Sequence, residues 1–317
     1  MSPETRRTAY IALIVALGGF LMGFDASVIA GVVGSIEVEF ALTKIQLGWS
    51  VSSLSLTATL GMLLSGPLSD RYGRRPVLMV AAVLFAISAV TSALAPDFLS
   101  FVLARMLGGF GVGAALIVAP MYIAEIAPPE HRGRMVSINH LNIFIGISAS
   151  FFSNYLILAL VESGAPLTES IGLGEQGWRW MLAVEALPAI AYFLALFGVP
   201  ESPRWLVMQG RDDAAKAVVT RLRGPAQAKA LLVQVHDSLA AEEELGQVGF
   251  RALLHPSLRL VLTIGLAVGI LQQATGINAV FFYAPMIFEQ TGVGTNAAFM
   301  QAVLVGLVNL LFTVVAM

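Results

Sequence analysis

Eight long apolar segments recur along this chain of 317 residues, and they constrain its fold more than any other feature. A helix needs about 20 consecutive apolar residues to cross the hydrocarbon core of a bilayer. Hydrophobic residues make up 57% of the chain and charged residues only 12%, which is too apolar for a soluble globular domain. The sequence therefore predicts an all-α membrane protein. The predicted spans are residues 8–34, 46–68, 76–95, 98–123, 135–160, 178–199, 258–288 and 296–317.

The spacing of these segments divides the chain into three parts. Residues 1–199 hold six spans joined mostly by short loops, and residues 257–317 hold two more. Between them, residues 200–256 are richer in charge and in helix-forming Ala, Glu, Lys and Arg, as in RDDAAKAVVTRLRG. We expect an N-terminal six-helix bundle, a linker with short amphipathic helices, and part of a second bundle.

Basic residues concentrate in alternate loops, which predicts the orientation of the chain. The loops on one side hold only Lys44 and Arg179, beside several acidic residues. The N-terminus, the linker and the remaining loops hold the other basic residues, so the positive-inside rule places the N-terminus and the linker in the cytoplasm of a cell-membrane protein. The basic positions outside the linker on that side are Arg6, Arg7, Arg71, Arg74, Arg75, Arg132 and Arg134.

One acidic residue interrupts the first apolar run. Asp25 lies within IALIVALGGFLMGFDASVIAGVVG, where a carboxylate is costly and marks a functional site by default. At about 1.5 Å of rise per residue, Arg105 in the fourth span and Glu185 in the sixth reach a similar depth. A neighbouring guanidinium favours the ionised acid while desolvation opposes it, so these residues could act as a proton switch. Alternatively, each one caps a kink, extends towards the headgroups or meets a water-filled vestibule.

Three side-chain amides cluster in the seventh span. Gln272, Gln273 and Asn278 flank Gly276, where a helix can break and expose backbone groups. Amides offer hydrogen-bond donors and an acceptor without charge, which suits a neutral polyol. Transporters also place substrates at interrupted helices near mid-depth. Hydrogen bonding between helices is the alternative use of these amides.

The composition argues against several other kinds of site. The chain has no cysteine, so it holds no disulfide, zinc–thiolate site or thiol nucleophile. Its four histidines are scattered, and no nucleophile with a base and no metal-ligand cluster lies at membrane depth. We therefore expect no enzyme activity, no cofactor, no metal and no nucleic-acid partner. The expected state is a monomer in the lipid bilayer with a small substrate.

Four motifs follow one another along the chain. GPLSDRYGRR joins the second and third spans, and RMLGGFGVGAALIVAPMYIAEIAPPEHRGR covers the fourth span and its exit. VPESPRWL follows the sixth span, and QQATGINAVFFYAP lies in the seventh. Over nearly the whole chain, these motifs resemble the sugar porter branch of the major facilitator superfamily, close to its bacterial proton-coupled pentose and hexose carriers. The resemblance implies the major facilitator fold, here an N-terminal six-helix bundle, linker helices and the first two helices of the C-terminal bundle.

The first three motifs also carry small and charged residues with expected structural roles. Gly66 should let helices approach closely, and Gly108, Gly109, Gly111 and Gly113 should form a small-residue packing face. The resemblance implies a cytoplasmic salt-bridge network that latches the two bundles in the outward-facing state. Anchoring of helix ends at the headgroups is the alternative. The positions of this gate are Gly66, Asp70, Arg71, Arg74, Arg75, Glu125, Arg132, Glu201 and Arg204.

The resemblance also implies a mechanism. In the proton-coupled members, the acid matching Asp25 is the protonation site and pairs with the arginine matching Arg105, and the glutamate matching Glu185 lies near this pair. This implies proton-coupled monosaccharide symport by alternating access. Uncoupled transport of a sugar, polyol or related polar metabolite, and a non-transporting sugar sensor on the same scaffold, remain alternatives.

The resemblance assigns substrate contacts, with departures. The positions that match sugar contacts are Gln272, Gln273, Asn278 and Asn309, and Tyr283 retains one tyrosine of an aromatic pair. Phe282 replaces the other tyrosine, Ile147 replaces a polar residue, and His140 stands where the family often has glutamine. A packing role for His140 is the alternative. These departures leave the identity of the sugar or polyol open.

The family's second bundle has six helices, whereas this chain supplies two. We therefore expect the chain to be a piece of a longer protein. We also expect no transport by residues 1–317 alone, because one wall of the substrate cavity would be mostly missing.

Overall fold

The computed structural model describes residues 3–163, 172–244 and 255–316, and within these ranges it contains helices and no strand. Eight helical segments in this part of the chain are long and apolar enough to cross a membrane, which confirms the predicted architecture. The first six spans form a bundle. They are α1 (Pro3–Val28), α3 (Lys44–Tyr72), α4 (Arg74–Ala93), α5 (Phe98–Ile126), α6 (Arg132–Glu162), and α8 (Leu173–Ala183) followed by α9 (Ala186–Leu196).

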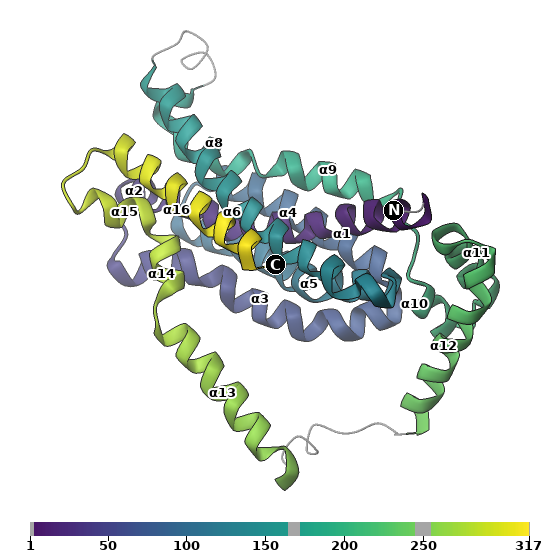
Figure 1. The fold of residues 1–317 in the computed structure, drawn as a ribbon. Coiled ribbons are helices and arrows are strands. Elements are labelled where there is room, and N and C mark those ends of the chain that lie inside the picture. The colour runs from purple at the N-terminus through teal and green to yellow at the C-terminus, as the bar shows by residue number, and fades with distance from the viewer. Residues whose placement is uncertain (1–2, 164–171, 245–254, 317) are drawn as a thin grey trace.

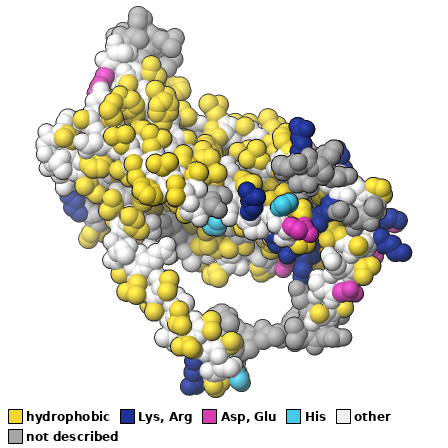
Figure 2. Space-filling model, in the orientation of Figure 1, with side chains coloured by type: hydrophobic (Ala, Val, Ile, Leu, Met, Phe, Trp, Pro, Cys, Tyr) yellow, Lys and Arg dark blue, Asp and Glu magenta, His cyan; other side chains and the backbone are white. Residues whose placement is uncertain are grey.

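The linker helices lie at one end of the bundle, beside the start of α1 (Figure 1). They are α10 (Pro203–Met208), α11 (Asp212–Arg223) and α12 (Pro225–Glu244). We name this end, which also carries Arg74, Arg75 and Arg132, the basic end. Lys and Arg side chains gather there, while hydrophobic side chains cover much of the rest of the visible face (Figure 2).

The last two spans contact the bundle over only part of their length. α13 (Arg259–Ala274) projects away from the bundle, and none of its residues is buried (Figure 1). α14 (Ile277–Phe282) and α15 (Ala284–Glu289) contact the turn that follows α1, and α16 (Thr295–Ala316) packs along α6. The buried residues of α16 all lie between Ala298 and Gly306, and none lies in residues 307–316: they are Ala298, Phe299, Ala302 and Gly306. The contacts between the two parts of the chain are therefore concentrated away from the basic end.

Two predicted spans are interrupted. The run 8–34 is not one helix, because α1 ends at Val28, a 3₁₀ turn η1 (Ile29–Gly31) follows, and α2 (Val33–Glu39) begins after it. The Asn154 side chain on α6 donates to the Val28 carbonyl oxygen over 3.1 Å and so satisfies a group in the last turn of α1. The run 258–288 breaks at Gly276, as its sequence indicated, with φ at +71° in the region that favours glycine.

Glycines bring two pairs of helices into backbone contact. A methyl group at Gly113 on α5 would lie 2.2 Å from the Ala58 carbonyl oxygen on α3. A methyl group at Gly23 on α1 would lie 2.0 Å from the Ile143 carbonyl oxygen on α6. Larger residues at these positions would push the helices apart, so the glycines set the distance between them. The predicted packing face of the fourth span is confirmed.

The role predicted for Gly66 is wrong. A methyl group there would meet no described atom within 4 Å, so Gly66 brings no neighbouring helix closer. Gly61, on the same helix, makes the approach to α5 instead, because a methyl group there would lie 2.9 Å from the Phe110 carbonyl oxygen.

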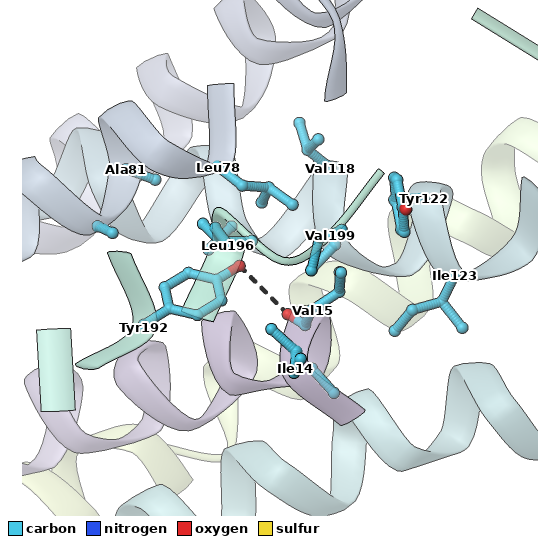
Figure 3. Packing of buried hydrophobic residues seen from close by; sticks show 14 of the residues in the cluster. Ile14, Val15, Leu78, Ala81, Val118, Tyr122, Ile123, Tyr192, Leu196 and Val199 are labelled. Carbon is cyan, nitrogen blue, oxygen red and sulfur yellow. Dashed lines mark hydrogen bonds between the residues drawn. The ribbon is translucent and has the colours of Figure 1, made fainter. Parts of the chain in front are cut away.

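One phenol links α9 to α1 through the apolar interior of the bundle (Figure 3). Tyr192 lies among buried aliphatic side chains that include Leu78 and Leu196. Its hydroxyl donates to the Val15 carbonyl oxygen over 3.2 Å. A buried hydroxyl needs such a partner, and this bond ties the end of the sixth span to the first.

The linker is attached to the bundle through helix ends. α11 places acidic residues in its first turn and arginines in its last, the order that the helix dipole favours. Thr8 Oγ1 on α1 donates to the Leu222 carbonyl oxygen over 3.4 Å. Arg223 Nη2 donates to the Ile126 carbonyl oxygen, at the end of α5, over 3.0 Å. α11 is therefore bonded to the start of one membrane span and the end of another.

A group of contacts around Arg179 links helices at the end opposite the basic end. Arg179 on α8 donates to the carbonyl oxygens of Ala93 and Ala95 over 2.8 Å each and to Glu39 over 2.8 Å. Its guanidinium also lies over the Trp178 ring, 4.3 Å from the centroid. From its position in the sequence Arg179 is only a loop charge, whereas in the structure it joins α8, α2 and the end of α4.

Replacing Gly113 by alanine should destabilise the fold, because the new methyl group would press on a backbone carbonyl that moves only with α3. We expect a loss of about 1–3 kcal/mol, as for other overpacked sites, seen as a lower melting temperature of the purified protein in detergent. Gly48→Ala on α3 is the matched control, since its methyl group would meet no described atom within 4 Å. Equal melting temperatures for the two variants would contradict the packing argument.

Candidate functional site

The predicted ion pair between Asp25 and Arg105 is present in the interior of the bundle. Both side chains are almost fully buried, at 0% and 2% exposed. Arg105 Nη1 donates to Asp25 Oδ1, and Arg105 Nη2 donates to the Asp25 backbone oxygen over 2.9 Å. The guanidinium thus holds both the carboxylate and a carbonyl oxygen in the last turn of α1. The fork of the guanidinium makes this double contact possible, because its N–H groups point in fixed directions.

Glu185 completes a buried group of three charged residues. It lies at the junction of α8 and α9, is 1% exposed, and interacts electrostatically with both Asp25 and Arg105. Asp25, Arg105 and Glu185, which were predicted to lie at a similar depth, are therefore also close to one another. Two carboxyl groups face one guanidinium, so the group is electrically neutral only when one carboxyl group holds a proton. Burial makes that neutrality energetically important.

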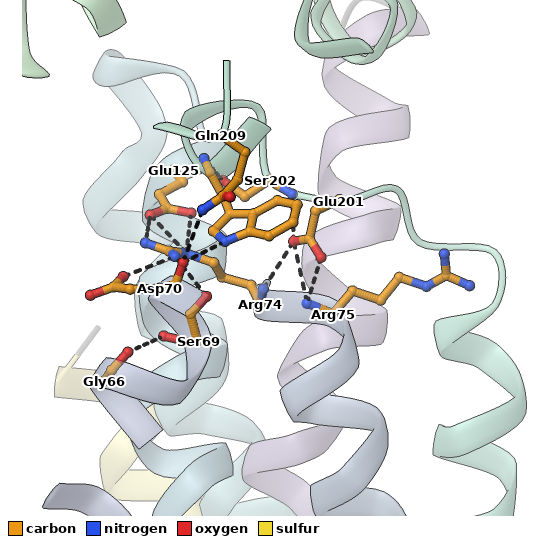
Figure 4. Close-up of polar contacts among 10 residues, drawn as sticks. Gly66, Ser69, Asp70, Arg74, Arg75, Glu125, Glu201, Ser202 and Gln209 are labelled. Carbon is orange, nitrogen blue, oxygen red and sulfur yellow. Dashed lines mark hydrogen bonds and ion pairs between the residues drawn. The ribbon is translucent and has the colours of Figure 1, made fainter. Parts of the chain in front are cut away.

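Arg74 is the centre of a charged cluster at the basic end (Figure 4). Its side chain is only 3% exposed. Arg74 Nη2 lies 2.9 Å from Glu125 Oε1, and Arg74 Nη1 lies 3.0 Å from Asp70 Oδ1. Arg74 Nη1 also donates to the Ser69 carbonyl oxygen over 3.0 Å. The cluster joins α3, α4 and α5.

Glu201 caps the start of α4 from a distant part of the chain. Its carboxylate accepts from the backbone N–H groups of Arg74 at 3.0 Å, Arg75 at 3.3 Å and Ser202 at 2.8 Å. The local cap residue, Gly73, offers no side chain and has φ at +102°. Burial raises the pKa of Glu201, although these N–H groups and the charge of Arg74 act in the opposite direction.

The other gate residues lie around this cluster. Arg75 Nε donates to the Leu196 carbonyl oxygen over 3.0 Å, and the Arg71 guanidinium lies 5.3 Å from the centre of the Tyr72 ring. Arg132 and Arg204 line a cavity of about 590 Å³ between the cluster and the linker helices. Every bond of the gate residues described here stays within the bundle and its linker.

The amides predicted to bind substrate lie around the break at Gly276. Gln272, Gln273 and Asn278 are all exposed. Asn278 Nδ2 donates to Gln273 Oε1 over 2.9 Å, so the break brings these two side chains together. Both remain accessible from outside the bundle.

The other candidate substrate residues are more dispersed. Phe282 and Tyr283 are half-buried and pack against the apolar cluster that includes Val28 and Ile29. Asn309 is half-buried and lines an apolar cavity of about 400 Å³ with neighbours on α14 and α16. His140 is exposed on α6. Among the described residues, no hydrogen bond joins His140 or Asn309 to the amides of the seventh span.

Two polar contacts between α6 and α16 were not anticipated. Ser148 Oγ donates to the Gly306 carbonyl oxygen over 2.9 Å, and Asn296 Nδ2 donates to Glu162 Oε2 over 2.6 Å. A methyl group at Gly306 would lie 3.1 Å from the Phe151 ring, so a small residue is needed there. The sequence signal was a glycine within an apolar helix, which identifies a contact but not its partner.

The chain also matches known proteins. The family described as "Sugar (and other) transporter" matches residues 11–317. This chain belongs to that family.

Individual members of the sugar transporter family support this. The chain is 41% identical over 306 residues to the arabinose-proton symporter of Bacillus subtilis (strain 168), covering 96% of this chain and 64% of that protein. It is 36% identical over 332 residues to the D-xylose-proton symporter of Escherichia coli (strain K12), covering 96% and 65% respectively. It therefore spans just under two-thirds of the length of these relatives.

A solved structure of the same family has the same fold. The proton:xylose symporter XylE, bound to 6-bromo-6-deoxy-D-glucose, matches with a TM-score of 0.84 at 36% identity. The match covers 98% of this chain and 69% of the XylE chain. The predicted resemblance to sugar porters and the major facilitator fold are confirmed.

Replacing Gly73 by alanine should destabilise the protein for two reasons. Its φ of +102° is unfavourable for other residues, and the new methyl group would lie 2.4 Å from Glu201 Oε2. We expect a loss of about 1–3 kcal/mol in stability, measured by thermal unfolding in detergent.

Gly210→Ala is the control for Gly73, because Gly210 also has a positive φ, at +67°, but its methyl group would meet no described atom within 4 Å. Gly73→Ala should cost less stability in a Glu201→Ala background than in the wild type, since the collision is then absent. An equal cost in the two backgrounds would show that the Glu201 carboxylate does not lie against Gly73.

Proposed function

We propose that the full-length protein is a secondary active transporter that couples proton influx to monosaccharide uptake by alternating access. The observation that carries the proposal is the buried pair of Asp25 and Arg105, with Glu185 beside it. Relatives named as arabinose-proton and D-xylose-proton symporters support both the coupling ion and the substrate class.

Protonation of Asp25 is the proposed coupling step. Neutralising the carboxylate removes the main attraction that holds Arg105 at α1, leaving the guanidinium with the Asp25 carbonyl oxygen and with Glu185. Arginine suits this exchange because it stays charged at every physiological pH. A proton thus loosens the tie between α1 and α5.

The position of the pair suggests how this change reaches the other bundle. Asp25 is one helical turn before η1, and η1 contacts α14 and α15. Ile29, in this turn, lies in one apolar cluster with Tyr283 and Met286. We propose that loosening α1 shifts η1 and, through it, the helices that follow the amide-rich break.

The proposed substrate is a small neutral sugar or polyol that binds beside this break. Gln272, Gln273 and Asn278 supply donors and acceptors without a charge to neutralise. Tyr283 and Phe282 would offer an aromatic surface to the sugar, and His140 and Asn309 would contribute from α6 and α16. The departures at His140 and Phe282 leave the choice between pentose, hexose and polyol to transport assays.

We propose that the basic end faces the cytoplasm, since Lys and Arg concentrate there. The Arg74 cluster would then act as a cytoplasmic gate that engages the second bundle in the outward-facing state. In this proposal the protein works as a monomer in the cell membrane, and its domains are residues 1–199, 200–256 and 257–317.

Asp25→Asn tests the proposal. Asparagine is permanently neutral, so sugar counterflow should persist while accumulation driven by a proton gradient should fall to the level seen with an uncoupler. Both would be measured with the full-length protein in proteoliposomes, using a panel of pentoses, hexoses and inositol.

Asp237→Asn is the matched control, because it removes the charge of an exposed residue on α12 far from the pair in sequence and outside the membrane spans. Undiminished, uncoupler-sensitive accumulation by Asp25→Asn would contradict the assigned role. Wild-type uptake that ignores the proton gradient would instead favour the uncoupled alternative.

A further inference from the structure

Two serine hydroxyls on α4 are buried and lack a hydrogen-bond partner among the described residues. Ser88 is 2% exposed and Ser92 is 0% exposed, and Oγ of each is unpaired. Thr91, on the same helix but exposed, instead donates to the Ile87 carbonyl oxygen over 2.6 Å. Buried polar atoms are nearly always paired with protein or ordered water, so the two serines call for a role.

Ser88 lies beside the free oxygen of Asp25. A methyl group at Gly108 would lie 2.5 Å from Ser88 Oγ and 2.8 Å from Asp25 Oδ2. Both oxygens are therefore close to the same position on α5. Arg105 donates to Asp25 Oδ1, the Glu185 carboxyl group also interacts with Asp25, and Oδ2 accepts from no N–H or hydroxyl group among the described residues. Gly108 and the Ser88 hydroxyl on α4 lie beside Oδ2.

Two more polar atoms in this buried region also lack a hydrogen-bond partner among the described residues. Glu185 Oε1 and Arg105 Nε are also buried and unpaired within the described part of the chain. Glu185 interacts with Asp25, and α4 packs against α5, α8 and α9. The unpaired atoms therefore lie between α4, α5, α8 and α9, where several polar groups together can hold ordered water.

Ser88 and Ser92 extend this group of polar atoms along α4, away from the basic end. Ser92 is one helical turn, about 5.4 Å, beyond Ser88 towards the end opposite the basic end. It is followed by Ala93, whose carbonyl oxygen accepts from Arg179, and by the exposed residues Leu94, Pro96 and Asp97. The line from Asp25 through Ser88 and Ser92 therefore approaches the surface on α4, whereas the amides of the seventh span flank the break before α14, which contacts α1 and η1.

We propose that Ser88 and Ser92, with bound water, form a proton route between the extracellular end and Asp25 that is separate from the sugar cavity. Each hydroxyl accepts a proton from the outer side and passes its own proton inwards. The hydroxyls are unchanged afterwards, and the net result is a protonated Asp25. The proposal rests on the proton-coupled function proposed above.

The charged groups that face Asp25 come from α5 and from the α8–α9 junction. Among the described residues, these groups are Arg105 and Glu185 respectively. α4 contributes only hydroxyls to this region. A kinetic effect of the serine variants would therefore come from proton delivery rather than from a changed charge beside Asp25.

The test combines Ser88→Ala with Ser92→Ala in the full-length protein. Neither hydroxyl makes a bond among the described residues, so the variant should fold normally, as checked by its melting temperature. Sugar-driven proton influx would be followed with a pH dye inside proteoliposomes, and sugar counterflow at equal pH would be measured beside it. Thr91→Ala removes an exposed hydroxyl from the same helix and serves as the control.

We expect proton influx to slow at least about tenfold, because a positioned proton-transfer group contributes roughly 10²–10⁴-fold to a rate and water would replace the hydroxyls only in part, while counterflow is unchanged. The slowing should be greatest at high external pH, where protons are scarce. Unchanged proton influx, or an equal decrease in influx and counterflow, would overturn the proposed route. Wild-type protein that shows counterflow but no sugar-driven proton influx would instead refute the coupled function itself.

Discussion

The pairing of Arg105 with Asp25 organises the interior of this protein. It joins the first and fourth spans at a depth where neither charge could be left alone, since removing one partner of a buried pair costs about 3–5 kcal/mol. The same guanidinium also binds a backbone oxygen in the last turn of α1. The pair therefore secures the helix end from which η1 begins, and η1 carries the contact with α14 and α15.

The two ends of the molecule are held together differently. At the basic end, arginines and carboxylates bond within the bundle and its linker, and α13 has no buried residue. At the opposite end, Asn296 donates to Glu162 on α6, and α16 packs along α6. Among the described residues, the contacts between the first six spans and the last two are thus concentrated away from the basic end. Alternating access needs the two bundles to be in contact at one end at a time, and the end that is in contact would change between its two states.

The sequence contained enough information for the spans and the buried pair, because both follow from the cost of placing polar groups in hydrocarbon, whereas the major facilitator fold was predicted from the resemblance of four motifs to sugar porters. Asp25 needed a partner, and helix rise was sufficient to identify Arg105. The sequence did not reveal that Glu201 caps α4, that Asn154 bonds the end of α1 or that Arg179 joins three helices. These contacts depend on how helices are rotated about their axes, and helices apolar on most faces do not encode that rotation.

The error at Gly66 has the same origin, since a small residue shows that close approach is possible but not which face of the helix makes it. The amides of the seventh span were identified by residue type and by the nearby glycine. Their placement relative to His140 and Asn309 could not be inferred, because it depends on how α13 and α16 pack rather than on local pattern.

The cap that Glu201 provides for α4 has a consequence for the linker. The first amide groups of α4 are bonded to a carboxylate that belongs to the segment leaving the sixth span. If that segment moved away, these amides would be left exposed to solvent and the first turn of α4 would tend to fray. The start of the third span and the start of the linker therefore form one cooperative unit, although 126 and 127 residues separate the bonded groups along the chain.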